Sequence, residues 1–187
     1  MTFETTDVLI VGAGPAGSVA AAFLRQQGRR VLVLEREQFP RFSIGESLLP
    51  QSMEYIEAAG MLRDVVEAGF QFKNGAAFAW GDRYTAFDFR EKVTDGWGST
   101  YQVQRAAFDK VLADAAARQG ADIRYRHEVT AIDLDGERPV VSARGTMRPK
   151  PLASSMKRPC TAYTSPSGAL TVTRGCSPST ATAVTWC

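Results

Sequence analysis

The residues best suited to chemistry lie near the start of the chain, where glycines alternate with small residues. Residues 12–17 read Gly12-Ala13-Gly14-Pro15-Ala16-Gly17, which is the spacing G-x-G-x-x-G. The first glycine permits a tight turn, the second lets the backbone approach a diphosphate, and the third lets a helix pack closely on a strand. Unpaired N–H groups and the positive dipole at the helix start would then bind the phosphates. The motif predicts a dinucleotide site.

The segments around the motif make this prediction specific. The apolar run 7–11 predicts a buried parallel strand, the Ala-rich run 16–27 predicts a helix, and residues 30–35 predict a second strand. Glu35 ends that second strand, where its carboxylate can accept hydrogen bonds from an adenosine ribose. Arg36 follows, and the pair suits the ribose of either FAD or NAD. We therefore predict an α/β fold with a Rossmann-type FAD/NAD(P)-binding domain.

The rest of the first 144 residues alternates predicted helices and strands. A loop over 36–49 leads to one or two helices broken near Gly60, and a hairpin turns at residues 81–83. Further predicted elements are a helix over 105–119 and strands at 122–125, 128–134 and 140–143. We expect residues 1–144 to form the FAD-binding domain, with residues 70–103 supplying the start of a β-rich substrate domain.

Composition changes after residue 144. Residues 145–187 hold five basic residues, no acid and all three cysteines, and no apolar period persists. Such a segment buries too little apolar surface to offset its ordering entropy. We predict that 145–187 is a disordered or non-homologous tail.

Composition also bears on partners and location. His127 is the single histidine and is expected to be an ordinary strand residue, and the cysteine spacings fit no zinc pattern, so we expect no metal site. No apolar run approaches the roughly 20 residues that span a membrane, and the start of the chain lacks the features of a signal peptide. We expect a cytoplasmic protein that binds neither membrane nor nucleic acid.

A resemblance to a known family begins at residues 41–50, Arg41-Phe42-Ser43-Ile44-Gly45-Glu46-Ser47-Leu48-Leu49-Pro50. This segment resembles the flavin-dependent halogenases, which belong to the FAD monooxygenases together with p-hydroxybenzoate hydroxylase and the geranylgeranyl reductases. Three further segments resemble the same family, and the resemblance covers roughly residues 5–144. They are residues 69–76 with Trp80-Gly81, residues 101–105 with Phe108-Asp109, and residues 120–132.

The resemblance implies that the cofactor is FAD and assigns residues to it. Arg41, Glu46 and Ser47 would lie in the loop beneath the flavin, although Glu46 equally suits the start of a helix before Pro50. An arginine in the position of Arg105 reaches FAD in the family, and its alternative is a plain surface arginine. Val129 lies in the segment that resembles the strand whose backbone meets the adenine.

The resemblance also implies a reaction, with Lys73 as the catalytic residue. Reduced FAD, supplied by a separate flavin reductase, reacts with oxygen to give a peroxyflavin, and halide attacks it to form hypohalous acid. The lysine then delivers the halogen to an electron-rich aromatic substrate. We expect Phe70, Phe72 and Phe78 to desolvate the amine and favour its neutral form. The alternative is a solvated lysine at the start of a strand.

Other functions stay open, because later motifs of the family are absent from the sequence. We expect an N-terminal fragment of a halogenase-like enzyme. The alternatives are an FAD-dependent hydroxylase, a geranylgeranyl-reductase-like flavoprotein and a non-catalytic FAD-binding remnant. The Phe and Trp residues between 70 and 101 are expected to form sheet core, with the wall of an aromatic pocket as the other interpretation.

Overall fold

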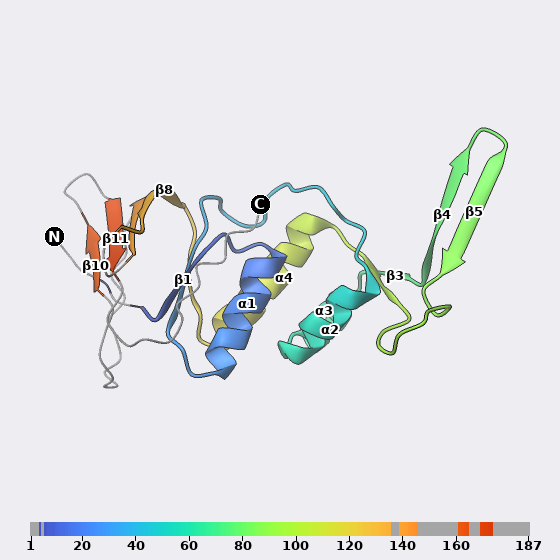
Figure 1. Cartoon of the computed structure of the whole chain (residues 1–187), viewed down its shortest axis with the longest axis horizontal. Coiled ribbons are helices and arrows are strands. Elements are labelled where there is room, and N and C mark those ends of the chain that lie inside the picture. The colour runs from blue at the N-terminus through green and yellow to red at the C-terminus, as the bar shows by residue number, and fades with distance from the viewer. Residues whose placement is uncertain (1–3, 5, 136–138, 146–160, 165–168, 174–187) are drawn as a thin grey trace.

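The computed structural model describes residues 4, 6–135, 139–145, 161–164 and 169–173. It begins with strand β1 (Val8–Val11), helix α1 (Pro15–Gln26) and strand β2 (Val31–Leu34). The two strands pair in parallel, with Val8 opposite Val31, and β7 (Asp122–Arg124) joins the other edge of β2. The predicted βαβ unit and the predicted Rossmann-type fold class are confirmed (Figure 1).

The central strand β2 is apolar at every position because both of its faces are covered. Val31 and Val33 pack into the main core with the helices. Leu32 and Leu34 pack on the opposite side, in a second core that includes Val141 of β9 (Val140–Gly145). Covered faces on both sides are the usual reason for an uninterrupted apolar strand.

Helix α4 (Arg105–Arg118) lies against α1 and completes the main core. Its buried face combines Phe108 and Leu112 with small alanines, and α1 contributes buried Ala21 and Ala22. Short helices α2 (Pro50–Ala58) and α3 (Leu62–Glu67) extend this layer. The predicted break at Gly60 is confirmed, since its positive φ of 68° ends one helix and allows the chain to turn into the next.

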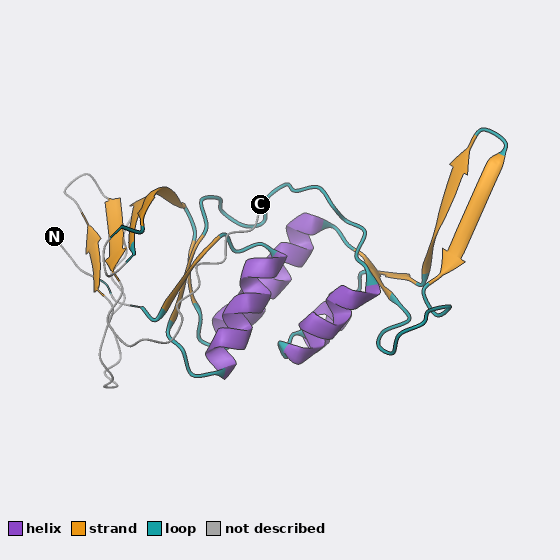
Figure 2. Ribbon diagram, viewed as in Figure 1, coloured by secondary structure: helices purple, strands orange, loops and turns teal. Residues whose placement is uncertain are grey.

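A second group of strands leaves the helical layer (Figure 2). Strand β3 (Gln71–Lys73) pairs antiparallel with β6 (Thr100–Gln102), and β4 (Gly75–Trp80) forms a hairpin with β5 (Arg83–Asp88). The predicted hairpin is confirmed. In Figure 2 the helices separate this hairpin from the β1-β2-β7 sheet.

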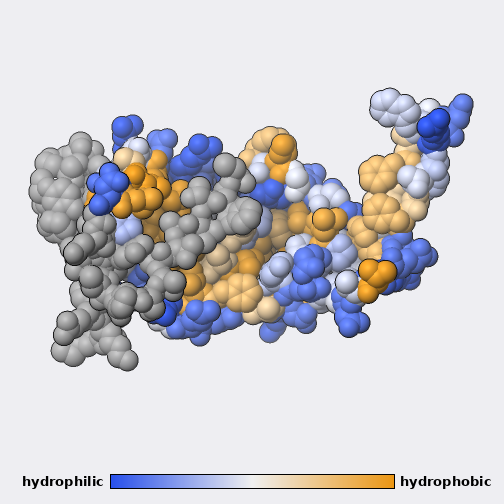
Figure 3. Space-filling view, in the orientation of Figure 1, coloured by the Kyte–Doolittle hydropathy of each residue, from blue (hydrophilic) through white to orange (hydrophobic). Residues whose placement is uncertain are grey.

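The prediction that the aromatic residues of 70–101 form sheet core is wrong for most of the hairpin. Phe70 and Trp97 do pack against the main core. Phe78 and Trp80, however, are 60% and 86% exposed, because nothing in the described residues covers this sheet. Figure 3 shows apolar side chains on the surface of the hairpin.

The strands predicted at 128–134 and 140–143 are confirmed as β8 (His127–Asp133) and β9 (Val140–Gly145), which form an antiparallel pair. Within 145–187, β10 (Thr161–Thr164) and β11 (Ala169–Thr173) extend this sheet in the order β10-β11-β9-β8. Both strands lie within the segment predicted to be a disordered or non-homologous tail. Their β-branched residues suit strands, and β9 offers an edge for them to join. The other residues beyond 145 lie outside the described part of the chain. No helix in that described part is long and apolar enough to span a membrane.

Candidate functional site

The glycine motif forms the turn between β1 and α1, and its three glycines serve different purposes. Gly12 has a φ of 95°, which favours glycine. A Cβ on Gly17 would lie 2.0 Å from the carbonyl oxygen of Gly12, so helix and strand can approach only without a side chain. Gly14 has an ordinary φ of −64°, and a Cβ there would meet only the guanidinium of Arg41, at 3.6 Å. Glycine at position 14 therefore keeps space open in front of the helix.

Helix α1 directs free donors into that space. Pro15 occupies the first helical turn, and the first intrahelical bond runs from the N–H of Ser18 to the carbonyl of Gly14. The N–H groups of Ala16 and Gly17 find no partner among the described residues, as expected in the first turn of a helix. Together with the helix dipole they favour an anion at this position.

Glu35 lies at the end of β2 with its carboxylate beside the glycine turn. Glu35 is buried, with 4% of the residue exposed. One carboxylate oxygen accepts a hydrogen bond from the N–H of Ala13 at 2.8 Å, and the other accepts one from the N–H of Glu37 at 2.9 Å. The carboxylate thus faces the glycine turn, and its binding to a ribose stays a prediction.

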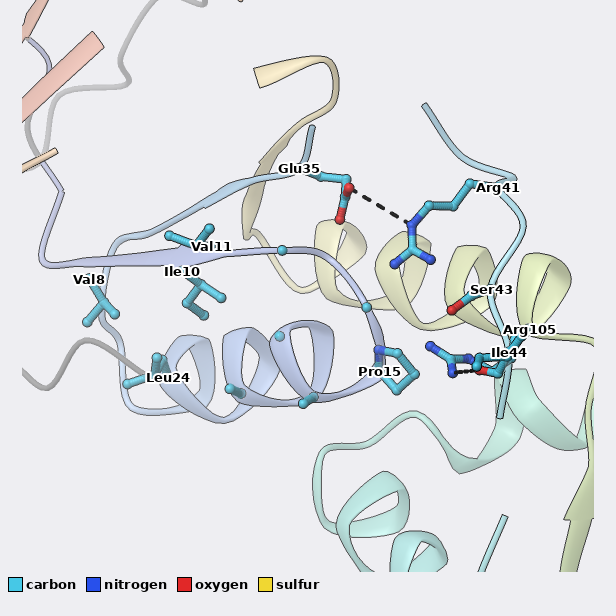
Figure 4. A pocket seen from close by; sticks show the side chains of 15 residues that line it. Val8, Ile10, Val11, Pro15, Leu24, Glu35, Arg41, Ser43, Ile44 and Arg105 are labelled. Atoms are coloured by element: carbon cyan, nitrogen blue, oxygen red, sulfur yellow. Dashed lines mark hydrogen bonds and ion pairs between the residues drawn. The ribbon is translucent and has the colours of Figure 1, made fainter. Parts of the chain in front are cut away.

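Two arginines, Arg41 and Arg105, lie near this turn (Figure 4), and both approach the carboxylate of Asp109. Asp109 is fully buried; it accepts hydrogen bonds from Nε and Nη2 of Arg105 at 2.7 and 3.1 Å. Arg41 places its Nη2 3.4 Å from Asp109 and its Nε 3.9 Å from Glu35. Arg105 also donates to the carbonyl of Ile44 at 2.6 Å, which ties α4 to the loop. The plain surface role for Arg105 is therefore excluded, since its side chain is only 17% exposed.

Sequence reasoning gave Asp109 no role. The sequence does contain a pattern that indicates a buried role for Asp109. This residue follows Arg105 by one helical turn and lies between Phe108 and Leu112 on the apolar face of α4. A carboxylate on a buried helix face needs a cationic partner. Asp109 supplies the charge that holds both arginines at the end of the glycine turn.

Two cavities adjoin at this point. The first, of about 490 Å³, lies along the glycine motif and reaches Glu35, Arg41 and Arg105. The second, of about 810 Å³, shares Gly12, Glu35 and Arg41 and continues past Arg36 to the start of β8, including Val129. Glu46 and Ser47 line neither of these two cavities, although the family resemblance implies that they lie at the cofactor.

Lys73 and the segment before α2 form a separate cluster. The Nζ of Lys73 donates to the hydroxyl of Ser47 at 2.5 Å and to the carbonyl of Leu48 at 3.2 Å. An aromatic ring does face this amine, but it is that of Phe89, at 5.0 Å from its centroid. The structure therefore does not show the predicted desolvation of the Lys73 amine by Phe70, Phe72 and Phe78.

The arrangement around the glycine turn fits a dinucleotide. The open N–H groups of α1 with Arg41 and Arg105 suit a diphosphate, and the space in front of Gly14 would be filled by a side chain there. Glu35 suits the ribose, and the second cavity continues toward β8. Fold and site together define a Rossmann-type dinucleotide-binding domain.

Comparison with known proteins identifies the dinucleotide. The chain belongs to the family described as FAD binding domain, whose model matches residues 5–150, and its cofactor is FAD. It is 39% identical over 140 residues to the tryptophan 2-halogenase of Chondromyces crocatus, covering 74% of this chain and 26% of that relative. It is 34% identical over 141 residues to the flavin-dependent halogenase armH2 of Armillaria mellea, covering 73% of this chain and 26% of the relative.

Solved structures agree with this assignment. The myxobacterial chondrochloren halogenase CndH superposes with a TM-score of 0.68 and 42% identity, over 75% of this chain and 33% of that one. A flavoprotein/dehydrogenase from Cytophaga hutchinsonii superposes with a TM-score of 0.72 and 47% identity, over 76% of this chain and 36% of that one. The chain therefore spans about a quarter of the length of the curated relatives and a third of these structures.

Proposed function

We propose that this chain provides the FAD-binding part of a flavin-dependent halogenase that acts on an electron-rich aromatic substrate. The observation that carries the proposal is the position of Lys73, whose amine is held where the loop after β2 meets the β3–β6 sheet. Support also comes from relatives that are halogenases by name. When bound and reduced, FAD would activate oxygen and allow halide to be oxidised to hypohalous acid, with a separate reductase supplying reduced FAD.

The residues of the glycine turn would bind and orient the cofactor. The N–H groups of Ala16 and Gly17, with Arg41 and Arg105, would hold the diphosphate, while Glu35 accepts the ribose hydroxyls. Ala13 and Pro15 shape the same turn. Arg36 and Val129, which line the second cavity, would contact the adenosine end.

The carbonyl of Glu46 accepts the N–H of Val103 at 2.8 Å, and its side chain is exposed. For Glu46, flavin contact stays a prediction. For Ser47, which faces Lys73, flavin contact stays a prediction.

The amine of Lys73 would act as the halogen carrier. Its lone pair attacks the halogen of hypohalous acid, an N–halogen bond forms, the O–halogen bond breaks, and hydroxide with the displaced amine proton leaves as water. An aromatic carbon then takes the halogen from nitrogen, the ring loses a proton, and the amine is regenerated. The exposed aromatic residues of the β4–β5 hairpin would form part of the wall around this substrate.

A second candidate is an FAD-dependent oxidoreductase that transfers no halogen, such as a hydroxylase or a reductase. One observation favours it: the similar structure from Cytophaga hutchinsonii is that of a flavoprotein/dehydrogenase. In such an enzyme Lys73 would be a structural residue that ties β3 to the loop before α2.

The mass of the product separates these functions. The FAD-loaded chain is supplied with a flavin reductase, oxygen and a panel of phenols, indoles and pyrroles, with chloride, bromide or neither. A halogenase gives products heavier by one chlorine or bromine, and only with the matching halide. Products that carry oxygen regardless of halide would establish a hydroxylase instead. Bound FAD with no product would identify a non-catalytic FAD-binding protein and refute the proposed reaction.

A further inference from the structure

The amine of Lys73 is held by two acceptors from a segment 25 and 26 residues earlier in the chain. The shorter contact, at 2.5 Å, is to the hydroxyl of Ser47, and the longer, at 3.2 Å, is to the carbonyl of Leu48. Phe89 places its ring centroid 5.0 Å from the same nitrogen. Of these three groups, the Ser47 hydroxyl is the polar side chain, and so it is the group that mutation can remove without changing the backbone.

Backbone pairing fixes where this hydroxyl lies. Strand β6 has β3 on one edge, with Lys73 opposite Thr100. On the other edge Ser47 pairs with Gln102, and the N–H of Leu48 donates to the carbonyl of Tyr101 at 3.2 Å. The lysine side chain therefore crosses β6 to reach Ser47. Since both partners are anchored to one strand, the position of the amine is set by the sheet.

In the neutral form of the amine that halogen transfer requires, the two acceptors would also set the direction of the lone pair. A neutral amine has two N–H groups and one lone pair around nitrogen. When Ser47 and Leu48 accept the two N–H groups, one direction remains for the lone pair, and an incoming electrophile must approach along it. Without the Ser47 hydroxyl the amine would rotate about a single remaining hydrogen bond, and a flexible lysine stem would leave its position undefined.

We propose that Ser47 is the positioning residue of Lys73: its hydroxyl holds the amine in the orientation needed to take and pass on halogen. The proposal rests on the proposed function of Lys73 for its chemical meaning, whereas the hydrogen bond itself can be tested without turnover. This positioning role of Ser47 differs from the role that the resemblance implies, in which Ser47 contacts the cofactor. Ser47 acts here through the lysine.

The test uses two substitutions of nearly equal shape in the FAD-loaded chain. Ser47→Thr keeps the hydroxyl, Ser47→Val removes it, and both β-branched residues suit the extended backbone of a bridge position. Ser52→Ala is the matched control, because the Ser52 hydroxyl contacts the carbonyl of Leu49 rather than the lysine. The readout is the ¹H–¹⁵N signal of the Lys73 side chain, assigned with Lys73→Arg, and its rate of hydrogen exchange with water. Loss of one hydrogen bond should raise that rate about tenfold in Ser47→Val. Ser47→Thr and Ser52→Ala should stay within about twofold of wild type.

A second measurement connects the hydrogen bond to chemistry. In the halogenation assay, Ser47→Val should lower halogenated product per oxygen consumed about tenfold, and Ser47→Thr should restore it. If wild type makes no halogenated product but the exchange rates follow the pattern above, the proposed function fails and the positioning role stands. Equal exchange rates in Ser47→Val and Ser47→Thr overturn the positioning role. Full product yield from Ser47→Val overturns it as well. A loss of FAD affinity without any change at Lys73 would place Ser47 at the cofactor and overturn it too.

Discussion

Replacing Gly14 by valine should leave the chain folded and remove most of its affinity for FAD. The backbone at Gly14 has a φ of −64° and a ψ of −177°, which valine adopts without strain. A Cβ at this position meets no atom closer than 3.6 Å, so the protein itself has room for it. The side chain would, however, occupy the space in front of the α1 N–H groups, where the diphosphate is expected.

The size of the effect follows from the contacts that the diphosphate would lose. Each hydrogen bond from a backbone N–H to a charged oxygen is worth about 1.5–3 kcal/mol. Loss of the bonds from Ala16 and Gly17 would cost about 3 kcal/mol at the low end of that range, which weakens binding about 100-fold. The assay is titration of FAD against the chain, followed by flavin fluorescence.

Gly17→Ala is the matched control, because it should destabilise the fold rather than occupy the space of the diphosphate. Its Cβ would lie 2.0 Å from the carbonyl oxygen of Gly12 and 3.3 Å from a methyl group of Ile10, so backbone must move. Overpacking of this kind costs about 3 kcal/mol, or about 10 °C in Tm for a chain of this size. Unchanged FAD affinity in Gly14→Val, or an unchanged Tm in Gly17→Ala, would refute this account of the turn.

Three further predictions concern the surrounding charges and one half-buried phenol. Asp109→Ala removes the buried partner of Arg41 and Arg105 and should lower the free energy of unfolding, measured in urea, by about 3 kcal/mol. An unchanged midpoint of urea unfolding would mean that water or other groups replace the carboxylate. Glu35→Gln keeps the shape but loses the charge, and should weaken FAD binding about tenfold by titration; equal affinity would remove the carboxylate from the ribose site. Burial, with the charges of Asp114 and Glu35, raises the pKa of Tyr125 from 10.0 to about 12. The folded state thus keeps a proton that the unfolded chain releases, and the free energy of unfolding should fall as the pH rises from 10 to about 12. Tyr125→Phe should reduce that fall in denaturation curves, and identical pH dependence in the two proteins would contradict the assignment.

The parts of the site that the sequence predicted are those whose constraints are local. Gly12 and Gly17 are required by the turn and by the close packing of α1 on β1, and both requirements are met within six residues. Glu35 follows from its place at the end of β2. The long-range parts could not be predicted in this way. Ser47 meets Lys73 only because both segments pair with β6, and this pairing depends on the whole sheet.

Charge and exposure account for the other differences between the sequence predictions and the structure. Asp109 was overlooked because a carboxylate within an alanine-rich helix is usually solvated, and only the packing of α4 buries it. The aromatic residues of the hairpin were assigned to a core because of their type. They are exposed because no described segment packs on that sheet. Sequence pattern predicts which residues can be buried, but the covering surface decides which ones are.

Halogenated product from Lys73 variants tests the proposed function most directly. The FAD-loaded chain, Lys73→Ala and Lys73→Arg are each given a flavin reductase, oxygen and bromide, and product mass is measured beside oxygen consumption. The account predicts equal oxygen consumption in all three and brominated product from wild type alone, because a guanidinium stays protonated and cannot carry the halogen. Brominated product from Lys73→Ala at half or more of the wild-type yield would contradict it.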